Sequence, residues 1–250
     1  MPTQLKLRQR YRVSEEVEQV FFEPEAPVQW LAGQYLELIM PGESGLYYTI
    51  ANAPSRVLEL HMDIATDSGT AARLLNQIEQ TGAVAAKVGQ GRCHVAQLPT
   101  DSSPVLLIAS GTGFSQVKAM VEALLRAPER PIFVYWAVRS MAGLYLADLA
   151  QSWADQYAHV HFAAVVSEQV SWHQGTHALY ACIEEQQHQW AQANVVCCGS
   201  PEMVYSTLDA LVAQGLDARR FWSDMLDFAP RPVALSEPQP NSVKPDEPLQ

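Results

Sequence analysis

Short runs rich in β-branched and aromatic residues fill the first hundred positions of the chain. They predict strands at 17–23, 34–40, 47–52, 57–64 and 83–88, with turn signals such as Pro-Gly-Glu-Ser-Gly at 41–45 between them. One helix interrupts the strands, because Leu74, Leu75 and Ile78 recur at helical spacing and Gly82 follows as a stop. Many short strands at this spacing favour a small antiparallel barrel.

From about residue 103 the pattern changes to strand and helix in turn. The run 105–109 is continuously apolar, as in a strand buried on both faces. Further strands are predicted at 132–138, 160–166, 195–198 and 221–225, and helices at 144–157, 177–187 and 202–214. This alternation predicts a doubly wound parallel sheet with helices on both faces.

The two patterns divide the chain into a β-barrel domain at 1–101 and an α/β domain at 102–228. The remaining segment, 229–250, holds six of the 16 prolines and almost no large apolar residue. Such a segment buries too little surface to offset its ordering entropy, so we expect it to be disordered.

Composition and charge exclude several classes of protein. The net charge of −11 comes without any cluster of Lys and Arg, which argues against nucleic-acid binding. Residues 1–16 are charged and have no apolar core, so they do not form a signal peptide, and no apolar run approaches the ~18 residues that span a bilayer. We therefore expect a cytoplasmic protein without a membrane span.

Cysteine and histidine spacing gives no sign of a metal centre. The four cysteines show no CxxC motif and no iron–sulfur spacing, which indicates reduced thiols. His159 and His161 alternate along a strand, but no third ligand is evident. Redox chemistry would therefore require an organic cofactor.

Loops after the carboxyl ends of the predicted parallel strands are the candidate binding sites. Gly111-Thr112-Gly113 follows the first of these strands, and two glycines there let backbone N–H groups approach a phosphate at a helix N-terminus. The pattern G-x-G-x-x-Q lacks the third glycine of the dinucleotide fingerprint, and a tight turn without a ligand would look the same. Ser115 is interpreted as the cap of the following helix.

Six segments, in order, resemble those of the ferredoxin–NADP reductase superfamily, and in particular its stand-alone NAD(P)H–flavin reductases. They are Ala-Gly-Gln-Tyr-Leu at 32–36, Tyr-Tyr-Thr-Ile-Ala-Asn at 47–52, Ile-Ala-Ser-Gly-Thr-Gly-Phe-Ser at 108–115, Tyr-Trp-Ala-Val-Arg-Ser at 135–140, Cys-Gly-Ser-Pro-Glu-Met at 198–203 and Phe-Trp-Ser-Asp at 221–224. Together they cover about residues 5–228. The order of the matches carries more weight than any single motif.

The resemblance implies a six-stranded flavin-binding barrel followed by an NAD(P)-binding domain, and hydride transfer from NAD(P)H to flavin. Thr49 and Cys198 are implied as catalytic, with Thr49 near flavin N5 and Cys198 near the nicotinamide. Cofactor binding is implied for Tyr48, Thr49, Ile50, Ala51, Gly111, Thr112, Gly113, Arg139, Gly199, Ser200, Pro201 and Met203. Hydride transfer needs two well-placed rings and no strong base.

Leu46 stands where the family usually has the arginine that pairs with the flavin phosphate. This departure favours riboflavin, or a loosely bound FMN or FAD, unless Arg56 or Arg92 substitutes for the missing charge. The main hypothesis is a flavin reductase whose product supplies an oxygenase or another electron acceptor. The alternatives are an electron-transfer component that retains its flavin for a partner protein, and a non-catalytic binding module of the same fold. Met225-Leu226, which replaces an Ala-Phe type pair, keeps the last alternative open.

Overall fold

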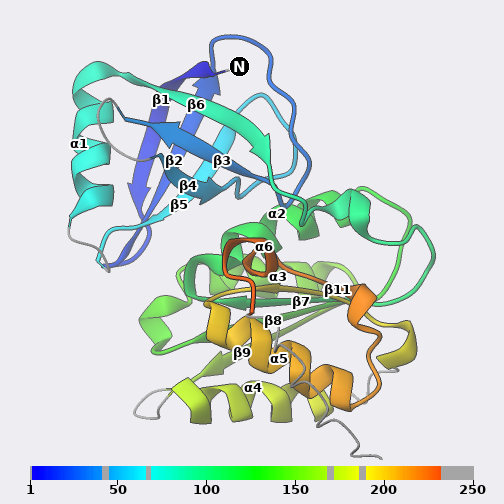
Figure 1. Cartoon of the computed structure of the whole chain (residues 1–250). Coiled ribbons are helices and arrows are strands. Elements are labelled where there is room, and N and C mark those ends of the chain that lie inside the picture. Colours follow the sequence, from blue (N-terminus) through cyan, green and yellow to red (C-terminus); the bar gives the residue numbers. More distant parts are fainter. Residues whose placement is uncertain (1, 41–44, 66–68, 168–171, 186–189, 232–250) are drawn as a thin grey trace, which may run out of the picture.

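A computed structural model describes residues 2–40, 45–65, 69–167, 172–185 and 190–231 of the chain. These residues form two units, an antiparallel barrel and a parallel α/β sheet (Figure 1). The predicted fold class is therefore confirmed, and the two predicted patterns correspond to the two units.

The barrel is a six-stranded sheet with the order β4-β3-β6-β1-β2-β5. Its strands are β1 (Thr3–Arg12), β2 (Val17–Pro24), β3 (Tyr35–Ile39), β4 (Leu46–Thr49), β5 (Leu58–Asp63) and β6 (Ala83–Gln90). A β-bridge between Ile50 and Leu60 joins the two outer strands and closes the sheet into a barrel. Helix α1 (Thr70–Thr81) packs Leu74, Leu75 and Ile78 into the barrel core and ends at Gly82, whose φ is +74°, as predicted.

Strand β1 escaped the sequence analysis because its apolar residues are few. Leu5 is fully buried, but most of the other positions in the strand are charged or polar. These charges are paired across the strands, for example Arg10 Nε with Glu18 Oε2 at 2.8 Å and Lys6 Nζ with Glu25 Oε1 at 3.2 Å. A strand whose outer face faces solvent tolerates such pairs, so it lacks a clear hydrophobic signature.

The second unit is a five-stranded, all-parallel sheet with the order β11-β10-β7-β8-β9. Its strands are β7 (Val105–Ser110), β8 (Ile132–Val138), β9 (Val160–Val166), β10 (Asn194–Cys198) and β11 (Phe221–Trp222), and its helices are α2 (Phe114–Leu124), α3 (Ala147–Gln156), α4 (Trp172–Glu185), α5 (Pro201–Ala213) and α6 (Met225–Phe228). Helix α4 begins earlier than predicted, and the last strand is shorter because α6 follows it directly.

Alternate residues of the sheet strands pack against helices on opposite faces, which confirms the doubly wound arrangement. Leu107 and Trp136 belong to the core beneath α2 and α3, whereas Leu106, Ile108 and Tyr135 belong to the core beneath α4 and α5. Figure 1 shows the two pairs of helices on the two sides of the sheet. Burial on both faces explains why these strands read as continuous apolar runs.

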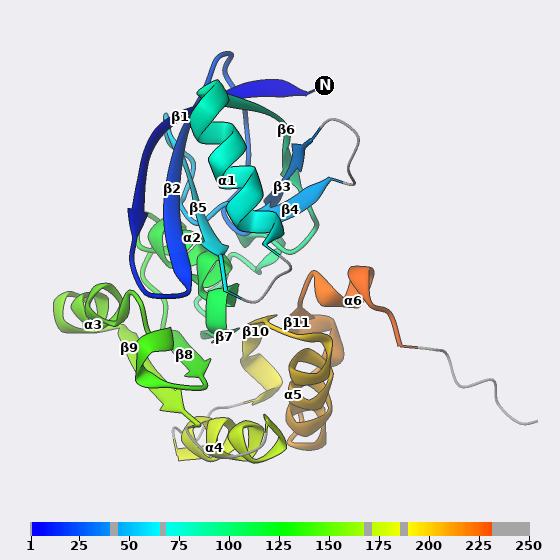
Figure 2. The same ribbon diagram turned by 90° about the vertical axis from the view of Figure 1, so that its left-hand side faces the viewer.

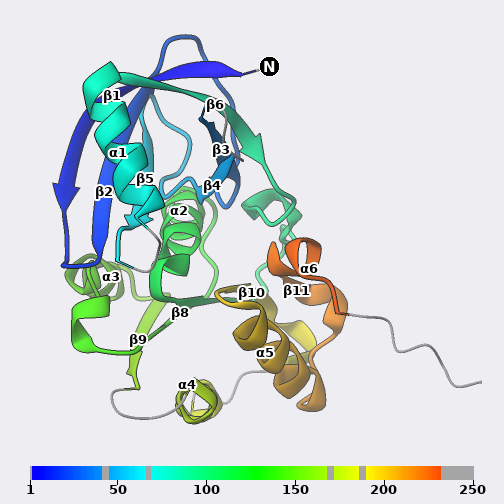
Figure 3. The same cartoon turned by 60° about the vertical axis from the view of Figure 1, so that its left-hand side comes forward.

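Helix α2 lies between the barrel and the sheet, as Figure 2 and Figure 3 both show. It is buried on nearly all sides, including its polar residues Ser115, Gln116 and Lys118. A helix on the surface would expose these side chains to water, but here the barrel covers them. Polar groups of α2 are therefore held at the junction of the two units.

The first residues of the predicted disordered segment are held against α5. Tyr205 donates its hydroxyl hydrogen to the Ala229 carbonyl at 2.8 Å, and the Arg231 guanidinium pairs with Asp209 and lies 4.2 Å from the centre of the Tyr205 ring. Ala229 and Arg231, which lie beyond the predicted boundary at 228, therefore contact α5. Residues 232–250 lie outside the described part of the chain.

Candidate functional site

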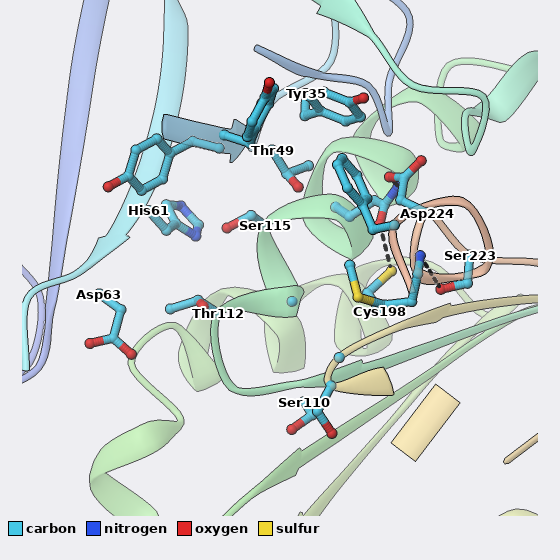
Figure 4. Close-up of a pocket in the computed structure, with 18 residues that line it drawn as sticks. Tyr35, Thr49, His61, Asp63, Ser110, Thr112, Ser115, Cys198, Ser223 and Asp224 are labelled. Carbon is cyan, nitrogen blue, oxygen red and sulfur yellow. Dashed lines mark hydrogen bonds between the residues drawn. The ribbon is translucent and has the colours of Figure 1, made fainter. Parts of the chain in front are cut away.

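A cavity of ≈ 610 Å³ opens where the barrel meets the carboxyl edge of the sheet (Figure 4). Its wall is formed by Tyr35, Tyr47, Tyr48, Thr49, His61, Asp63, Ser110, Thr112, Gly113, Ser115, Gln116, Cys198, Gly199, Ser200, Ser223, Asp224, Met225 and Phe228. Both the volume and the position beyond the strand ends are typical of small-molecule sites.

The sheet side of the cavity is built from two strand ends that approach each other closely. After β7 the chain turns through Gly111, with φ +51°, to Gly113 and enters α2. A Cβ on Gly113 would lie 2.4 Å from the carbonyl oxygen of Cys198 at the end of β10, so only glycine fits. Helix α5 also starts at this edge, where Ser200 Oγ accepts a hydrogen bond from Met203 N at 3.3 Å. Two helix N-termini thus face the region expected to hold the dinucleotide.

The interpretation of Ser115 as a helix cap is wrong. Gly113 occupies the cap position of α2 and no side chain caps the helix. Ser115 is the second residue of the helix, is 3% exposed and lines the cavity. Its hydroxyl is therefore part of the site.

Gln116, which stands where the dinucleotide fingerprint has its third glycine, connects both units. Its Nε2 donates to the carbonyl oxygens of Gly33 at 2.7 Å and Cys93 at 3.0 Å, and to Asp224 Oδ2 at 3.0 Å. Its Oε1 accepts from Cys198 Sγ at 2.9 Å. The departure from the glycine pattern was visible in the sequence, but the partners that give it a role were not.

Cys198 and Asp224 share this corner of the cavity, and burial shifts both of them toward the neutral form. Burial raises the pKa of the Cys198 thiol well above its usual range, so it is a hydrogen-bonding thiol and not a thiolate. Burial, and then the charge of Asp227, raise the pKa of Asp224 to about 6, although hydrogen bonds from Gln116 and Cys93 oppose the shift. Asp224 was not among the predicted site residues.

Replacing Asp224 with asparagine is expected to raise the free energy of unfolding at pH 7–8 by about 1–3 kcal/mol, since one pKa unit corresponds to ~1.4 kcal/mol. The carboxyl holds its proton up to about pH 6 when folded but only to ~4 when unfolded, so native stability falls as pH rises through that window. Urea unfolding from pH 4 to pH 8 would measure this fall. Asp227→Asn, at an exposed neighbour paired with Arg92, should retain most of it, because burial is the larger cause of the Asp224 shift. Parallel pH profiles for native protein and Asp224→Asn would contradict the assignment.

The barrel side of the cavity presents aromatic rings and hydroxyls. Of the four residues predicted here, Tyr48 and Thr49 line the cavity from β4, whereas Ile50 and Ala51 are fully buried behind it. Three further rings, Tyr35, Tyr47 and Phe228, meet at the mouth with ring centres 5.4–5.9 Å apart. Figure 4 shows Thr49 and Tyr35 across the cavity from Cys198.

A buried group of charges crosses from the barrel to α2 behind this wall. Lys118 Nζ donates to Glu59 Oε2 at 2.8 Å, to Glu122 Oε1 at 2.7 Å and to the Ala51 carbonyl at 3.1 Å. Burial alone would raise the pKa of Glu59, but the hydrogen bond from His61 and the charge of Lys118 outweigh it and lower the pKa to about 2. The junction therefore contains buried carboxylate and ammonium groups that are paired with one another.

Other predicted residues lie at the edge of the site or outside its wall. Arg139 is exposed just after β8, and Gly111, Pro201 and Met203 support the wall without lining it. None of the described residues that line the cavity is a lysine or an arginine.

Nothing in the described wall takes the place of the charge missing at Leu46. Leu46 pairs with Leu38 and packs against the barrel core. Arg56 pairs with Glu23 and Arg92 with Asp227, and neither lines the cavity.

No group of three or more potential metal ligands occurs within the described residues. Among the described helices, none has the length and apolarity needed to cross a membrane.

The known proteins that this chain resembles include oxidoreductases of related kinds. The model of the oxidoreductase NAD-binding domain matches residues 107–209. The CDP-6-deoxy-L-threo-D-glycero-4-hexulose-3-dehydrase reductase of Yersinia pestis is 31% identical over 205 residues, 80% of this chain and 61% of that protein. The NAD(P)H-flavin reductase of Vibrio harveyi is 33% identical over 158 residues, 60% of this chain and 66% of that protein. The chain thus spans about three fifths of the length of the Yersinia relative.

Solved structures agree with this result. An Amycolatopsis cytochrome P450 reductase superposes with a TM-score of 0.73 at 25% identity, covering 90% of this chain and 69% of that one. The fold also matches a ferredoxin-NADP+ reductase from Plasmodium falciparum, with a TM-score of 0.74 at 16% identity and coverage of 88% and 94%. With its barrel, its parallel sheet and the cavity between them, the chain belongs to the ferredoxin–NADP reductase superfamily of oxidoreductases.

Proposed function

We propose that the chain is an NAD(P)H-dependent flavin reductase that transfers hydride from nicotinamide C4 to N5 of a flavin substrate. The observation that carries this proposal is that one cavity is lined both by Tyr48 and Thr49 of the barrel and by Gly113 and Cys198 of the sheet unit. Hydride transfer requires two rings held face to face at about 3–3.5 Å, and a cavity with one wall from each unit suits that task.

The side chains around the cavity have distinct roles in this proposal. Tyr48 packs against the flavin ring and Thr49 offers a hydroxyl near its N5. The turn at 111–113 and the N-terminus of α5 bind the dinucleotide through backbone N–H groups. Cys198, held neutral and hydrogen-bonded to Gln116, adds no competing charge beside the nicotinamide. None of these groups needs to act as a strong base.

The charge of the cavity favours a flavin without phosphate. Its described lining residues include the carboxyl groups of Asp63 and Asp224 but no lysine or arginine. A phosphate is bound best by a bidentate arginine, so FMN and FAD gain no charged contact from this wall. We therefore expect binding through the ring and a substrate preference for riboflavin, or a loosely held FMN.

Replacing Leu46 with arginine is expected to improve FMN binding by about tenfold and to leave riboflavin binding unchanged, because only FMN has a phosphate for the new guanidinium. Equilibrium titration of both flavins against both proteins measures the ratio. Leu46→Met, which keeps an apolar side chain on β4, is the matched control. An unchanged FMN-to-riboflavin ratio in Leu46→Arg would show that the flavin tail does not pass Leu46.

The proposed function is tested by following NADH and NADPH oxidation by flavin-free protein, with riboflavin, FMN or FAD added in turn. Turnover with riboflavin at least equal to that with FMN is the expected result. Absence of turnover with every flavin, together with absence of retained flavin after purification, would overturn the enzyme hypothesis and favour a binding module.

A second candidate function is an electron-transfer component that keeps its flavin and supplies a partner enzyme. It is supported by the similarity to proteins named as the reductase of a dehydrase and as a cytochrome P450 reductase. Under this alternative the purified protein is yellow, and free flavin is a poor substrate. The oxygenase or acceptor protein would then be a direct binding partner.

A further inference from the structure

Gln116 is the point at which four separate segments of the chain meet. Its Nε2 donates to the carbonyl oxygens of Gly33, in the turn before β3, and Cys93, in the connection between the two units, and to Asp224 Oδ2 after β11. Its Oε1 lies 2.9 Å from Cys198 Sγ at the end of β10 (Figure 4). Gln116 is 4% exposed and lines the cavity, so these contacts lie inside the site.

The two backbone carbonyls settle the orientation of the Gln116 amide. A carbonyl oxygen only accepts hydrogen bonds, so the group 2.7 Å from the Gly33 oxygen and 3.0 Å from the Cys93 oxygen must be the NH₂ group. The opposite orientation would place the amide oxygen against two carbonyl oxygens. The atom beside Cys198 is therefore the amide oxygen, which has no hydrogen.

This oxygen determines where the hydrogen of the Cys198 thiol points. An amide oxygen 2.9 Å from a sulfur requires the sulfur to carry the hydrogen between them, since a thiolate would meet the negative end of the amide dipole directly. Burial acts in the same direction, because it raises the pKa of the thiol well above its usual range. The S–H bond is therefore directed at Gln116, and the sulfur meets a ligand only with its lone pairs.

Gly113 restricts Cys198 from the other side. A Cβ on Gly113 would lie 2.4 Å from the carbonyl oxygen of Cys198 and 3.2 Å from its Cβ, so the turn packs directly on this residue. With its backbone held there, Cys198 keeps only the rotation of its side chain, and turning Sγ to another staggered position would break the contact with Gln116. Gln116 thus removes the remaining freedom of a side chain that lines the cavity.

We infer that Gln116 is a positioning residue of the hydride-transfer site, which holds the Cys198 sulfur beside the nicotinamide with its hydrogen turned away from the ring. This inference rests on the proposed function, in which Cys198 lies next to the nicotinamide. A thiol free to rotate would present competing orientations to the ring, whereas the held sulfur presents one. The two N–H hydrogens of Gln116 are shared among three acceptors within the protein, so Gln116 acts on the ligand through Cys198.

The first test measures the S–H stretching band of Cys198 by infrared difference spectroscopy, with each protein compared with its Cys198→Ala counterpart. The native band should lie at the lower wavenumber of a hydrogen-bonded thiol. It should move to higher wavenumber in Gln116→Leu, which fills most of the same space without an acceptor. A native band at the wavenumber of a free thiol would overturn the inference, even if Gln116→Leu failed to fold.

The second test asks whether Gln116 acts through Cys198. Gln116→Leu should lower kcat by about tenfold, the effect of one hydrogen bond, with a smaller change in KM for NAD(P)H. In the Cys198→Ala background the same substitution should lower kcat by less than about twofold. Cys198→Ser, whose hydroxyl also donates to Oε1, should keep the dependence on Gln116. Equal factors in the native and Cys198→Ala backgrounds would show a purely structural role and overturn the inference.

Glu122 provides a matched control on the same helix. Its Oε2 accepts from Ala53 N at 3.0 Å, so Glu122→Leu also removes a bond between α2 and the barrel, but one that does not involve Cys198. It should leave the S–H band in place. A band that shifts equally in Glu122→Leu would mean that loosening of the junction moves the thiol, and would overturn the inference.

The two tests separate the inference from the proposed function. A shifted band in a protein that reduces no flavin would refute the proposed function but leave the orientation of the thiol, whereas turnover with an unshifted band would refute the inference alone. Urea unfolding of each variant identifies a loss of activity that comes from a loss of fold.

Discussion

Replacing Gly113 with alanine is expected to lower kcat/KM of the proposed hydride transfer by about 100-fold or more. The added Cβ would lie 2.4 Å from the Cys198 carbonyl oxygen and 2.9 Å from its carbon, and backbone atoms cannot rotate away as a side chain could. Either the turn or the end of β10 must move, and both form the sheet wall of the cavity. A shift of about 1 Å between reacting groups costs on the order of 100-fold in rate. Steady-state NAD(P)H oxidation with the preferred flavin measures it.

Gly111→Ala is the matched control for this prediction. Gly111 has φ +51°, which disfavours alanine by ~1 kcal/mol, but a Cβ there would meet nothing within 4 Å. It should lower the free energy of unfolding slightly and leave the cavity wall in place. A Gly113→Ala protein with nearly native kcat/KM would show that the approach of Gly113 to Cys198 does not position the substrates.

Replacing Lys118 with methionine is expected to lower the free energy of unfolding by about 3–5 kcal/mol, the usual cost of removing one partner from a buried ion pair. Lys118 and Glu59 have side chains only 6% and 8% exposed, so the Glu59 carboxylate would be left without its cation. Urea unfolding at pH 7 measures the loss. The same variant should weaken the coupling of the two units, because Lys118 on α2 also binds the Ala51 carbonyl just beyond Thr49.

An exposed pair provides the control for Lys118. Lys87 Nζ lies 2.7 Å from Glu37 Oε2 on the barrel surface, where the lysine side chain is 49% exposed, and Lys87→Met should lower the free energy of unfolding far less than Lys118→Met does. Equal losses in the two variants would contradict a special role for the buried network.

The stability contributed by Glu59 should also depend on pH. Its folded pKa of about 2 lies below the ordinary ~4.3 of an unfolded glutamate, so the contribution is complete above pH ~4.3 and is lost as pH falls toward 2. In Lys118→Met this acid-dependent loss should shrink, since the carboxylate no longer has the ammonium that lowers its pKa.

Much of the fold was predictable because, in most strands and helices, the residues that the sequence pattern marks as apolar are the residues that are buried. The predicted strands 132–138 and 160–166 coincide with β8 and β9, and Gly82 ends α1 as expected. Strands inside a covered sheet must be apolar at nearly every position, which makes their ends easy to recognise. Strand β1 was missed for the opposite reason, since its charges are paired with residues on β2 and just beyond its end, which no local pattern reveals.

The candidate site was predictable only in part. The glycine turn at 111–113, Tyr48, Thr49 and Cys198 were found because they lie within short motifs, and the cavity includes most of them. Gln116 and Asp224 were not predicted as site residues. Their role comes from the hydrogen bond between them, which joins residues more than a hundred positions apart in the sequence.

The sequence by itself determined the two units, their order and the superfamily, because hydrophobic periodicity and motif order are local properties of the chain. Only the tertiary structure decided the polar interior of the junction. Glu59 and His61 occupy the outward positions of an alternating strand and would be read as solvent-facing, but α2 packs over them and buries them at 6% and 4% exposure. Once water is excluded, each buried polar group must find its hydrogen-bond partner within the protein, as Glu59 does with Lys118 and His61.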